Sequence, residues 1–219
     1  QPLARMVDPG LTQGMVEYVT GHVLRYHLGL DQPTTQWAPV VPPLAQERRV
    51  VFLGLGELGR ACASSLAGLG FEVAGWSRTP RDVAGVRCHS GADGLNRALA
   101  CADILVTLLP DTPATANILN ADTLMRLPRG ARIINPGRGT LIDDDALLAA
   151  LESGQVAAAT LDVFRTEPLP ADHFYWHHPR VTVTPHIAAA TRAGTAAQVI
   201  ADNILRAETG HPLQHQVSR

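Results

Sequence analysis

Short apolar runs alternate with Ala- and Leu-rich stretches from Arg49 to about residue 190. Most runs are apolar throughout, which is typical of strands buried on both faces of a parallel sheet. The expected strands are 50–53, 71–74, 104–108, 132–134, 157–161 and 181–183. Strand–helix alternation of this length predicts an α/β fold with a doubly wound parallel sheet. Before it, the apolar spacing in residues 12–29 predicts a helix closed by Gly29, and the proline-rich residues 31–43 predict a loop or arm.

A GxGxxG motif directly follows the first of these strands, with its glycines at positions 54, 56 and 59. Gly54 permits a tight turn, Gly56 allows the backbone to approach a pyrophosphate, and Gly59 allows close helix–strand packing. The N-terminus of the following helix, expected over 60–69, offers free N–H groups to the phosphates. The motif therefore predicts dinucleotide binding by Gly54, Gly56, Glu57, Leu58 and Gly59.

The end of the second strand indicates which dinucleotide is bound. An NAD site usually has Asp or Glu about 20 residues beyond the glycines to hold the ribose 2′-hydroxyl. Here Ser77 lies 21 residues after Gly56, and two arginines follow it. Arginine binds a phosphate through a two-pronged contact that hydroxyls can complete, so NADP(H) is expected in preference to NAD(H). The residues assigned are Trp76, Ser77, Arg78, Thr79 and Arg81; a solvated basic loop is the alternative.

Composition excludes several functional classes. All 18 basic residues are arginine, so Schiff-base, pyridoxal-phosphate and P-loop chemistry, which need lysine, are excluded. The net charge of −2 gives no reason to expect nucleic acid or an anionic membrane as a partner. Cys62, Cys88 and Cys101 form no CxxC pair and are expected to be small buried residues in a reducing compartment. No apolar run approaches the roughly 18 residues needed to span a bilayer, and the N-terminal residues do not resemble a signal peptide, so a cytoplasmic location is expected.

Three further motifs occur in a fixed order. Residues 135–139 read NPGRG, residues 161–169 read LDVFRTEPL, and residues 184–188 read TPHIA. Arg138 precedes Glu167 by 29 residues, and Glu167 precedes His186 by 19. In sequence and spacing this set resembles the D-isomer-specific 2-hydroxyacid dehydrogenases. The greatest likeness is to their glyoxylate/hydroxypyruvate reductases, through the WSRT sequence at residues 76–79, the EPLP sequence at 167–170 and the W-x-H-P-R-V sequence ending at Val181. The resemblance implies a Rossmann-type NAD(P)-binding domain and reduction of a small 2-keto acid.

The resemblance also implies roles for the three spaced residues, and the chemistry agrees with them. Reduction of a 2-keto acid needs a proton for the carbonyl oxygen, which His186 can donate because imidazole titrates near neutral pH. Glu167 can orient the His186 ring and stabilise its imidazolium form. Arg138 can bind the substrate carboxylate and polarise the carbonyl. Taken singly, each residue also has a purely structural interpretation.

Other positions are assigned by the resemblance alone. Asp162 corresponds to the residue that binds the nicotinamide carboxamide, and His186 also lies against the cofactor. The remaining positions carried over to the cofactor site are Leu108, Leu109, Pro110, Thr115, Pro136, Gly137 and Ala188. Trp37 in the proline-rich arm either reaches the active site of a partner subunit or simply packs.

No metal site is expected. His173 and His177 have helical i, i+4 spacing, but the prolines around them argue against a regular helix. Asp143, Asp144 and Asp145 precede an apolar stretch and are interpreted as the N-terminal cap of a helix.

Family members are longer than this chain and have a second, smaller substrate domain. We expect residues 1–5 to be a remnant of that domain, residues 6–190 to form the dinucleotide-binding domain with its Rossmann core at 49–190, and residues 191–219 to be a C-terminal helix and tail returning to the substrate domain. Two hypotheses stay open: an NADPH-dependent reductase of glyoxylate and hydroxypyruvate, and a noncatalytic dinucleotide-binding or dimerisation module. The chain is expected to be either a fragment or a natural short form. The resemblance implies a homodimer.

Overall fold

The computed structural model describes residues 2–4, 6–32, 37 and 39–217. Seven parallel strands form one sheet in the order β3-β2-β1-β4-β5-β6-β7. The strands are β1 (Arg49–Leu53), β2 (Glu72–Ser77), β3 (Arg87–Ser90), β4 (Ile104–Thr107), β5 (Ala131–Asn135), β6 (Val156–Leu161) and β7 (Val181–Val183). The prediction of a doubly wound parallel sheet is confirmed.

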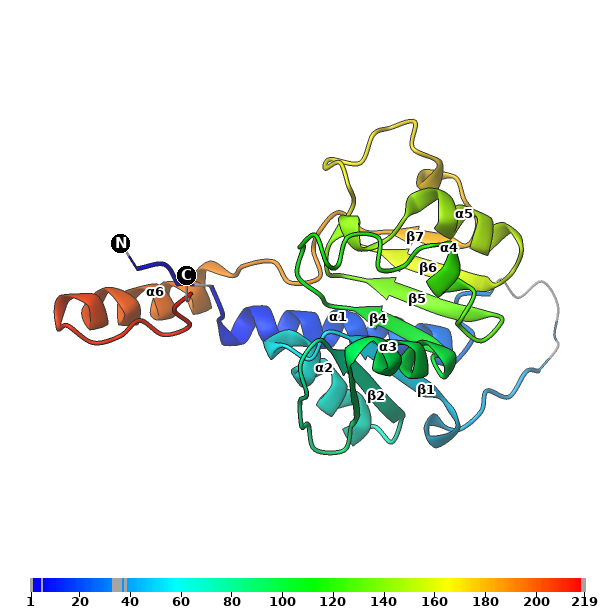
Figure 1. Cartoon of the computed structure of the whole chain (residues 1–219). Coiled ribbons are helices and arrows are strands. Elements are labelled where there is room, and N and C mark those ends of the chain that lie inside the picture. Colours follow the sequence, from blue (N-terminus) through cyan, green and yellow to red (C-terminus); the bar gives the residue numbers. More distant parts are fainter. Residues whose placement is uncertain (1, 5, 33–36, 38, 218–219) are drawn as a thin grey trace.

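Helices cover both faces of the sheet (Figure 1). They are α1 (Pro9–His27), α2 (Glu57–Gly68), α3 (Gly91–Ala100), α4 (Ala121–Leu124), α5 (Asp144–Glu152) and α6 (Ala193–Glu208). Three short 3₁₀ turns are η1 (Ala45–Glu47), η2 (Gly139–Leu141) and η3 (Phe174–Trp176). None of the helices in the described residues combines the length and apolar character needed to cross a bilayer.

The apolar strands divide their side chains between two cores. In β1, Val51 and Leu53 join a core that includes residues of α3, α4 and α5, whereas Val50 and Phe52 join one that includes residues of α1 and α2. All four side chains are fully buried. Because successive residues of a strand point to opposite faces, a strand covered on both sides must be apolar at every position.

Several elements differ from their expected bounds: α2 begins at Glu57 rather than residue 60, and β2 spans Glu72–Ser77 rather than 71–74. Helix α1 begins at Pro9 rather than residue 12, because Asp8 accepts hydrogen bonds from the N–H groups of Gly10 and Leu11 and Pro9 occupies the first helical position. Strand β3 was not expected at all. It is a four-residue edge strand that pairs only with β2, and it has no fully buried residue.

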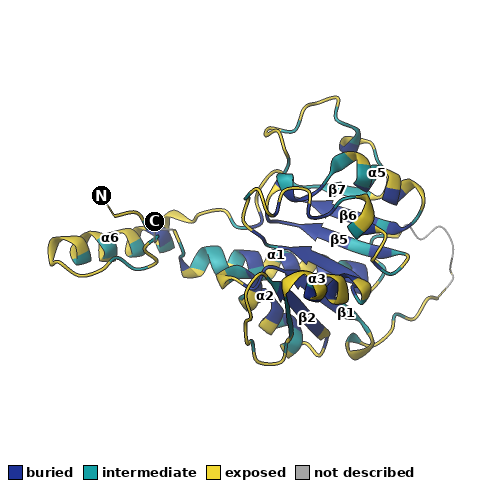
Figure 2. Cartoon of the chain, in the orientation of Figure 1, coloured by how far each residue is buried: buried dark blue, intermediate teal, exposed yellow. Residues whose placement is uncertain are grey.

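Helix α6 lies apart from the sheet, beyond the start of α1 (Figure 1). Only Ala196 of this helix is buried, while Ile200, Ile204 and Leu205 are exposed (Figure 2). The two ends of the described chain meet beside it, where Ala4 and Gln216 form an antiparallel bridge. This part of the molecule has little core of its own.

Candidate active site

The predicted site residues gather at the carboxyl edge of the sheet. Gly54 follows β1, Ser77 ends β2, Leu108 follows β4, and Asp162 follows β6. Since β1 and β4 are neighbours whose connections run to opposite sides, the glycine turn lies at the point where the strand order reverses. Doubly wound sheets bind their ligands at this point.

The glycine turn is closed on one side and open on the other. Gly54 has a φ of +108°, and a Cβ there would lie 2.5 Å from the carbonyl oxygen of Leu108. A Cβ on Gly59 would lie 1.9 Å from the carbonyl oxygen of Gly54. By contrast, a Cβ on Gly56 would meet nothing within 4 Å, and no side chain caps the first turn of α2. The turn therefore fits a bound pyrophosphate, with free N–H groups facing open space.

The two residues between Gly56 and Gly59 have side chains engaged elsewhere. Glu57 is exposed and forms an ion pair with Arg60 one turn along α2. Leu58 is half-buried and packs against the core under α1 and α2. For these two residues the backbone N–H is the group that a phosphate can use.

The end of β2 divides into a buried and an exposed part. Trp76 is 8% exposed, and its indole N–H donates to the carbonyl of Gly91 at 2.8 Å. The Trp76 side chain therefore packs in the core, so the group that this residue can offer to a cofactor is its backbone. Ser77 folds back to donate to the carbonyl of Thr79 at 2.7 Å. Arg78 and Arg81 are exposed.

The loop after β4 is held by its own hydroxyl groups. Thr115 is nearly buried and donates to the carbonyl of Pro110 at 2.6 Å. Leu109 is buried in the core, and the carbonyl of Leu108 faces Gly54. Thr115 and Leu109 thus shape the loop, while the Leu108–Pro110 backbone borders the glycine turn.

A buried amide holds the loop that carries Arg138. The Asn135 side-chain oxygen accepts from the Thr107 hydroxyl at 2.7 Å and from the N–H of Gly137 at 3.1 Å. Its amide nitrogen donates to the carbonyl of Arg138 at 3.0 Å. In the sequence, Asn135 stands out only as part of a motif; an amide residue that ends a largely apolar strand is the signal that points to this structural role.

Close backbone packing then joins the Arg138 loop to the loop that carries Glu167. A Cβ on Gly139 would lie 2.0 Å from the carbonyl carbon of Phe164, and one on Gly137 would lie 2.7 Å from the carbonyl oxygen of Thr107. Only glycine fits at either position. Pro136 completes this tightly packed segment, so Arg138 is carried by a rigid loop.

Glu167 and His186 form a direct pair. The Glu167 Oε2 atom is 2.7 Å from His186 Nδ1, and its Oε1 atom accepts from the N–H of Phe164 at 2.9 Å. Burial alone would raise the pKa of Glu167, but the hydrogen bonds from His186 and Phe164 and the charges of His186 and Arg138 outweigh it and lower the pKa. The pair leaves the Nε2 atom of His186 available to a ligand. The structure therefore brings together all three residues expected to act in catalysis.

Asp162 organises the turn that carries His186. Its carboxylate accepts from the N–H groups of Ile187 and Ala188, each at 2.9 Å, and from the hydroxyl of Thr184 at 2.5 Å. Its carbonyl accepts from the N–H of His186 at 2.8 Å. His186 itself adopts a left-handed backbone with φ of 55°. The side chain of Asp162 is buried, so its position is fixed.

Several side chains considered in the sequence lie outside this cluster. Trp37 is fully exposed, so it packs against none of the described chain. His173 caps η3 and stacks on Phe174, and no group of three or more His, Cys, Asp or Glu side chains suited to a metal occurs in the described residues. Asp143 caps α5 as predicted. Cys62 is buried as expected, whereas Cys88 and Cys101 are only half-buried.

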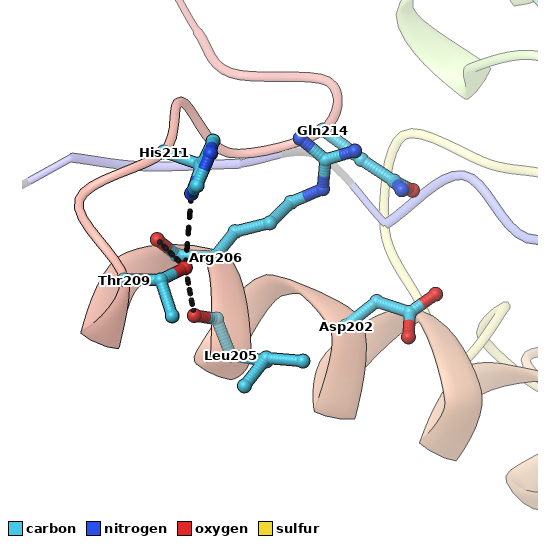
Figure 3. A pocket seen from close by; sticks show the side chains of 6 residues that line it. All are labelled: Asp202, Leu205, Arg206, Thr209, His211 and Gln214. Atoms are coloured by element: carbon cyan, nitrogen blue, oxygen red, sulfur yellow. Dashed lines mark hydrogen bonds between the residues drawn. The ribbon is translucent and has the colours of Figure 1, made fainter.

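A shallow hollow lies on α6 and the segment after it, away from the sheet (Figure 3). It is lined by Asp202, Leu205, Arg206, Thr209, His211 and Gln214. Thr209 bonds there to the carbonyl of Leu205 and to the His211 ring. None of the predicted site residues lines this hollow.

Comparison with known proteins identifies the family. Residues 24–188 match the profile described as D-isomer specific 2-hydroxyacid dehydrogenase, NAD binding domain. The chain is 46% identical over 214 residues to glyoxylate/hydroxypyruvate reductase A of Serratia proteamaculans, an alignment that spans 95% of this chain and 68% of that protein.

Solved structures show the same fold. A D-isomer specific 2-hydroxyacid dehydrogenase of Xanthobacter autotrophicus, in complex with NADPH and MES, superposes with a TM-score of 0.95 at 45% identity over 100% of this chain and 92% of that one. An NADPH-dependent glyoxylate/hydroxypyruvate reductase of Sinorhizobium meliloti, in complex with NADP and sulfate, gives a TM-score of 0.92 at 36% identity over 99% and 72%. The chain therefore belongs to the D-isomer-specific 2-hydroxyacid dehydrogenases, a family of oxidoreductases.

Proposed function

We propose that this protein reduces small 2-keto acids, glyoxylate and hydroxypyruvate above all, with NADPH as the reductant. The observation that carries the proposal is the His186–Glu167 pair at 2.7 Å, with Arg138 close enough for its charge to act on the same carboxylate. This cluster occupies the same edge of the sheet as the open glycine turn. An acid, its orienting carboxylate and a cation beside a dinucleotide site match the needs of keto-acid reduction.

Each residue of the cluster has a distinct task in the proposed reaction. Arg138 binds the substrate carboxylate and draws electron density toward the carbonyl oxygen. His186 donates its Nε2 proton to that oxygen, while Glu167 holds Nδ1 and stabilises the charged ring before transfer. Bound NADPH would supply the hydride to the carbonyl carbon. Asn135 and Asp162 keep the Arg138 and His186 loops in place through the hydrogen bonds described above.

The preference for NADPH rests on the end of β2. Ser77 stands where a carboxylate would hold the ribose of NAD, and Arg78 and Arg81 are exposed beside it. Neither arginine forms an ion pair with a carboxylate in the described part of the chain. Two free guanidinium groups favour the 2′-phosphate that distinguishes NADP, and both solved relatives cited above contain NADP or NADPH.

The segments outside the sheet are proposed to belong to a second domain and to a dimer interface. We assign α6 and the paired segments at residues 2–4 and 216–217 to the second, substrate domain, because their apolar side chains have no core to join. The exposed apolar side chains of the arm, Trp37, Val40 and Val41, and of Leu44 directly after it support a homodimer. Three unpaired thiols agree with a cytoplasmic location.

The proposal is tested by titrating NADPH and NADH into the protein by fluorescence and then following NADPH oxidation with glyoxylate or hydroxypyruvate. Tighter binding of NADPH, and turnover that disappears in a His186→Ala control, are expected. Binding of NADPH without turnover of either acid would instead favour the noncatalytic dinucleotide-binding module. Equal affinity for both cofactors would contradict the assignment of Arg78 and Arg81.

A further inference from the structure

Three hydrogen bonds join one side of α1 to β6, to β7 and to the residue that follows β7. Tyr18 bonds to Thr184 at 2.7 Å, Tyr26 bonds to Thr160 at 2.7 Å, and the Arg25 guanidinium donates to Thr182 at 2.9 Å. Two of these bonds join a tyrosine hydroxyl to a threonine hydroxyl at the same distance. They differ in what lies beyond the threonine.

Beyond Thr184 the chain of hydrogen bonds continues to the acid–base cluster. The Thr184 hydroxyl donates to Asp162 Oδ1 at 2.5 Å, and that carboxylate accepts from the N–H groups on the far side of His186. Thr160 makes no such onward side-chain bond in the described structure. The Tyr18 bond is therefore connected to His186, and the Tyr26 bond is not.

The direction of the protons in this chain is fixed. A hydroxyl has one proton to give, and Thr184 gives its proton to the Asp162 carboxylate, so it must accept from Tyr18. Burial raises the pKa of Tyr18 well above its usual value, which keeps the phenol protonated and able to donate. Each link supports the next, as expected of hydrogen bonds in series.

The turn that carries His186 has a backbone conformation that must be held by its surroundings. The left-handed backbone of His186 is uncommon for a residue with a side chain and persists only where its surroundings enforce it. Four hydrogen bonds to Asp162 enforce it here, from the N–H groups of His186, Ile187 and Ala188 and from the Thr184 hydroxyl. Only the hydroxyl bond is in turn anchored to a helix.

We propose that Tyr18 and Thr184 are positioning residues that set the orientation of His186 through Asp162. The inference rests on the proposed function in so far as His186 is the proton donor. It extends that function from the carboxyl edge of the sheet to the face of α1, 166 residues away in the chain. Neither residue touches the substrate or the cofactor in this account.

The test compares Tyr18→Phe with Tyr26→Phe. Each variant removes one hydroxyl from the same helix and one 2.7 Å bond to a threonine, and the Tyr26 bond is the more deeply buried of the two, so a general loss of stability would affect the control at least as much. Tyr18→Phe is expected to lower kcat for glyoxylate about fivefold to tenfold, the weight of one net hydrogen bond, with KM changed less than about twofold. Tyr26→Phe is expected to keep the kcat of the unaltered protein. Equal loss in both variants would overturn the proposal.

A second pair of variants tests the same proposal if Tyr18→Phe fails to fold. Thr184→Val removes the hydroxyl at nearly constant volume, and Thr184→Ser restores it. We expect the valine variant to lose kcat about tenfold or more, because misplacing a catalytic group by about 1 Å can cost about 10²-fold, and the serine variant to recover most of it. Loss of kcat in both variants would show that the hydroxyl is not what matters and would overturn the proposal.

A readout independent of turnover separates this inference from the proposed function. The proton on His186 Nδ1, bonded to Glu167, should give a downfield nuclear magnetic resonance signal, assigned by its absence from a His186→Asn variant. We expect this signal to weaken in Tyr18→Phe and Thr184→Val and to persist in Tyr26→Phe and Thr184→Ser. Weakening in that pattern without keto-acid reduction by the unaltered protein would refute the proposed function and leave the positioning role standing. An unchanged signal in Tyr18→Phe would refute the positioning role.

Discussion

The two edges of the sheet use arginine in different ways. At the amino edge, Arg49 donates three hydrogen bonds to Asp103, and Arg132 lies 3.3 Å from Asp31. At the carboxyl edge, Arg78, Arg81 and Arg138 have no carboxylate ion pair within the described residues.

The contrast separates structural arginines from those available to a ligand. Arg165, at the carboxyl edge but outside the proposed site, is paired with Asp144 like the arginines of the amino edge. A guanidinium already bonded to a carboxylate stabilises the fold, whereas an unpaired one can bind an anion. Apart from histidine, arginine is the only cationic residue type in this chain. The presence or absence of a carboxylate partner therefore indicates whether an arginine is structural or available to a ligand.

The largest effect is expected at the carboxyl edge, from the loss of the acid. His186→Ala should lower kcat about 10²- to 10⁴-fold and leave NADPH affinity nearly unchanged, because it removes the proton donor. Stopped-flow kinetics and fluorescence titration measure the two quantities. Turnover at the level of the unaltered protein would mean that another group donates the proton.

Exchanging one arginine at each edge tests the comparison directly. Arg138→Ala should lower kcat/KM about 10²- to 10³-fold, with kcat falling and KM rising together, because Arg138 serves binding and carbonyl polarisation. Arg49→Ala should leave kinetics unchanged and lower the midpoint of thermal unfolding. Loss of activity in Arg49→Ala, whether alone or to the same extent as in Arg138→Ala, would contradict the distinction between structural and ligand-binding arginines.

A smaller effect is expected at the proposed 2′-phosphate site. Arg78→Ala should weaken NADPH binding about 10- to 100-fold, the weight of one charge-assisted contact, with little change for NADH. Arg87→Ala is the matched control, since Arg87 lies on the adjacent β3 and is paired with Glu72 at 3.2 Å. Isothermal titration calorimetry measures both affinities. A similar loss in the control would show a general effect of positive charge.

The smallest effect concerns stability at the amino edge. Burial alone would raise the pKa of Asp103, but the hydrogen bonds and charge of Arg49 outweigh it and lower the pKa. The folded state therefore favours the ionised form, and this stabilisation is present above the ordinary pKa of aspartate and lost as the pH falls through the lowered value. Asp103→Asn should lower the free energy of unfolding by about 1 kcal/mol at pH 7. The difference in stability between the variant and the unaltered protein should become smaller below about pH 4. Urea unfolding at several pH values measures this difference. A difference that does not change with pH would contradict the stabilisation of ionised Asp103 by Arg49.

Most of the fold could be predicted because its signals are local. Most of the buried strands contain a run of apolar residues, and the glycine turn is contained in six residues. Strand β3 could not be predicted from such signals, since four half-buried or exposed residues at a sheet edge carry no hydrophobic pattern. The early start of α1 depended on a cap at Asp8 that the apolar spacing does not show.

The site was only partly predictable, for a related reason. The motifs named Arg138, Glu167 and His186, but not the contacts that hold their loops. Asn135 bonds to Thr107, and Tyr18 to Thr184, across long stretches of sequence. The direction of the Trp76 side chain was not predictable either, because a strand end carries both inward and outward side chains; its indole turns inward to Gly91.

The backbone of His186 also restricts how this position can change during evolution. With φ at 55°, β-branched residues are strongly disfavoured there, while glycine, asparagine and aspartate are tolerated. The substitutions that keep the turn intact thus offer no group that titrates as imidazole does. A lineage that lost this histidine would keep a folded dinucleotide site with an idle acid position, and we expect inactive descendants to carry Gly or Asn here more often than Val or Ile.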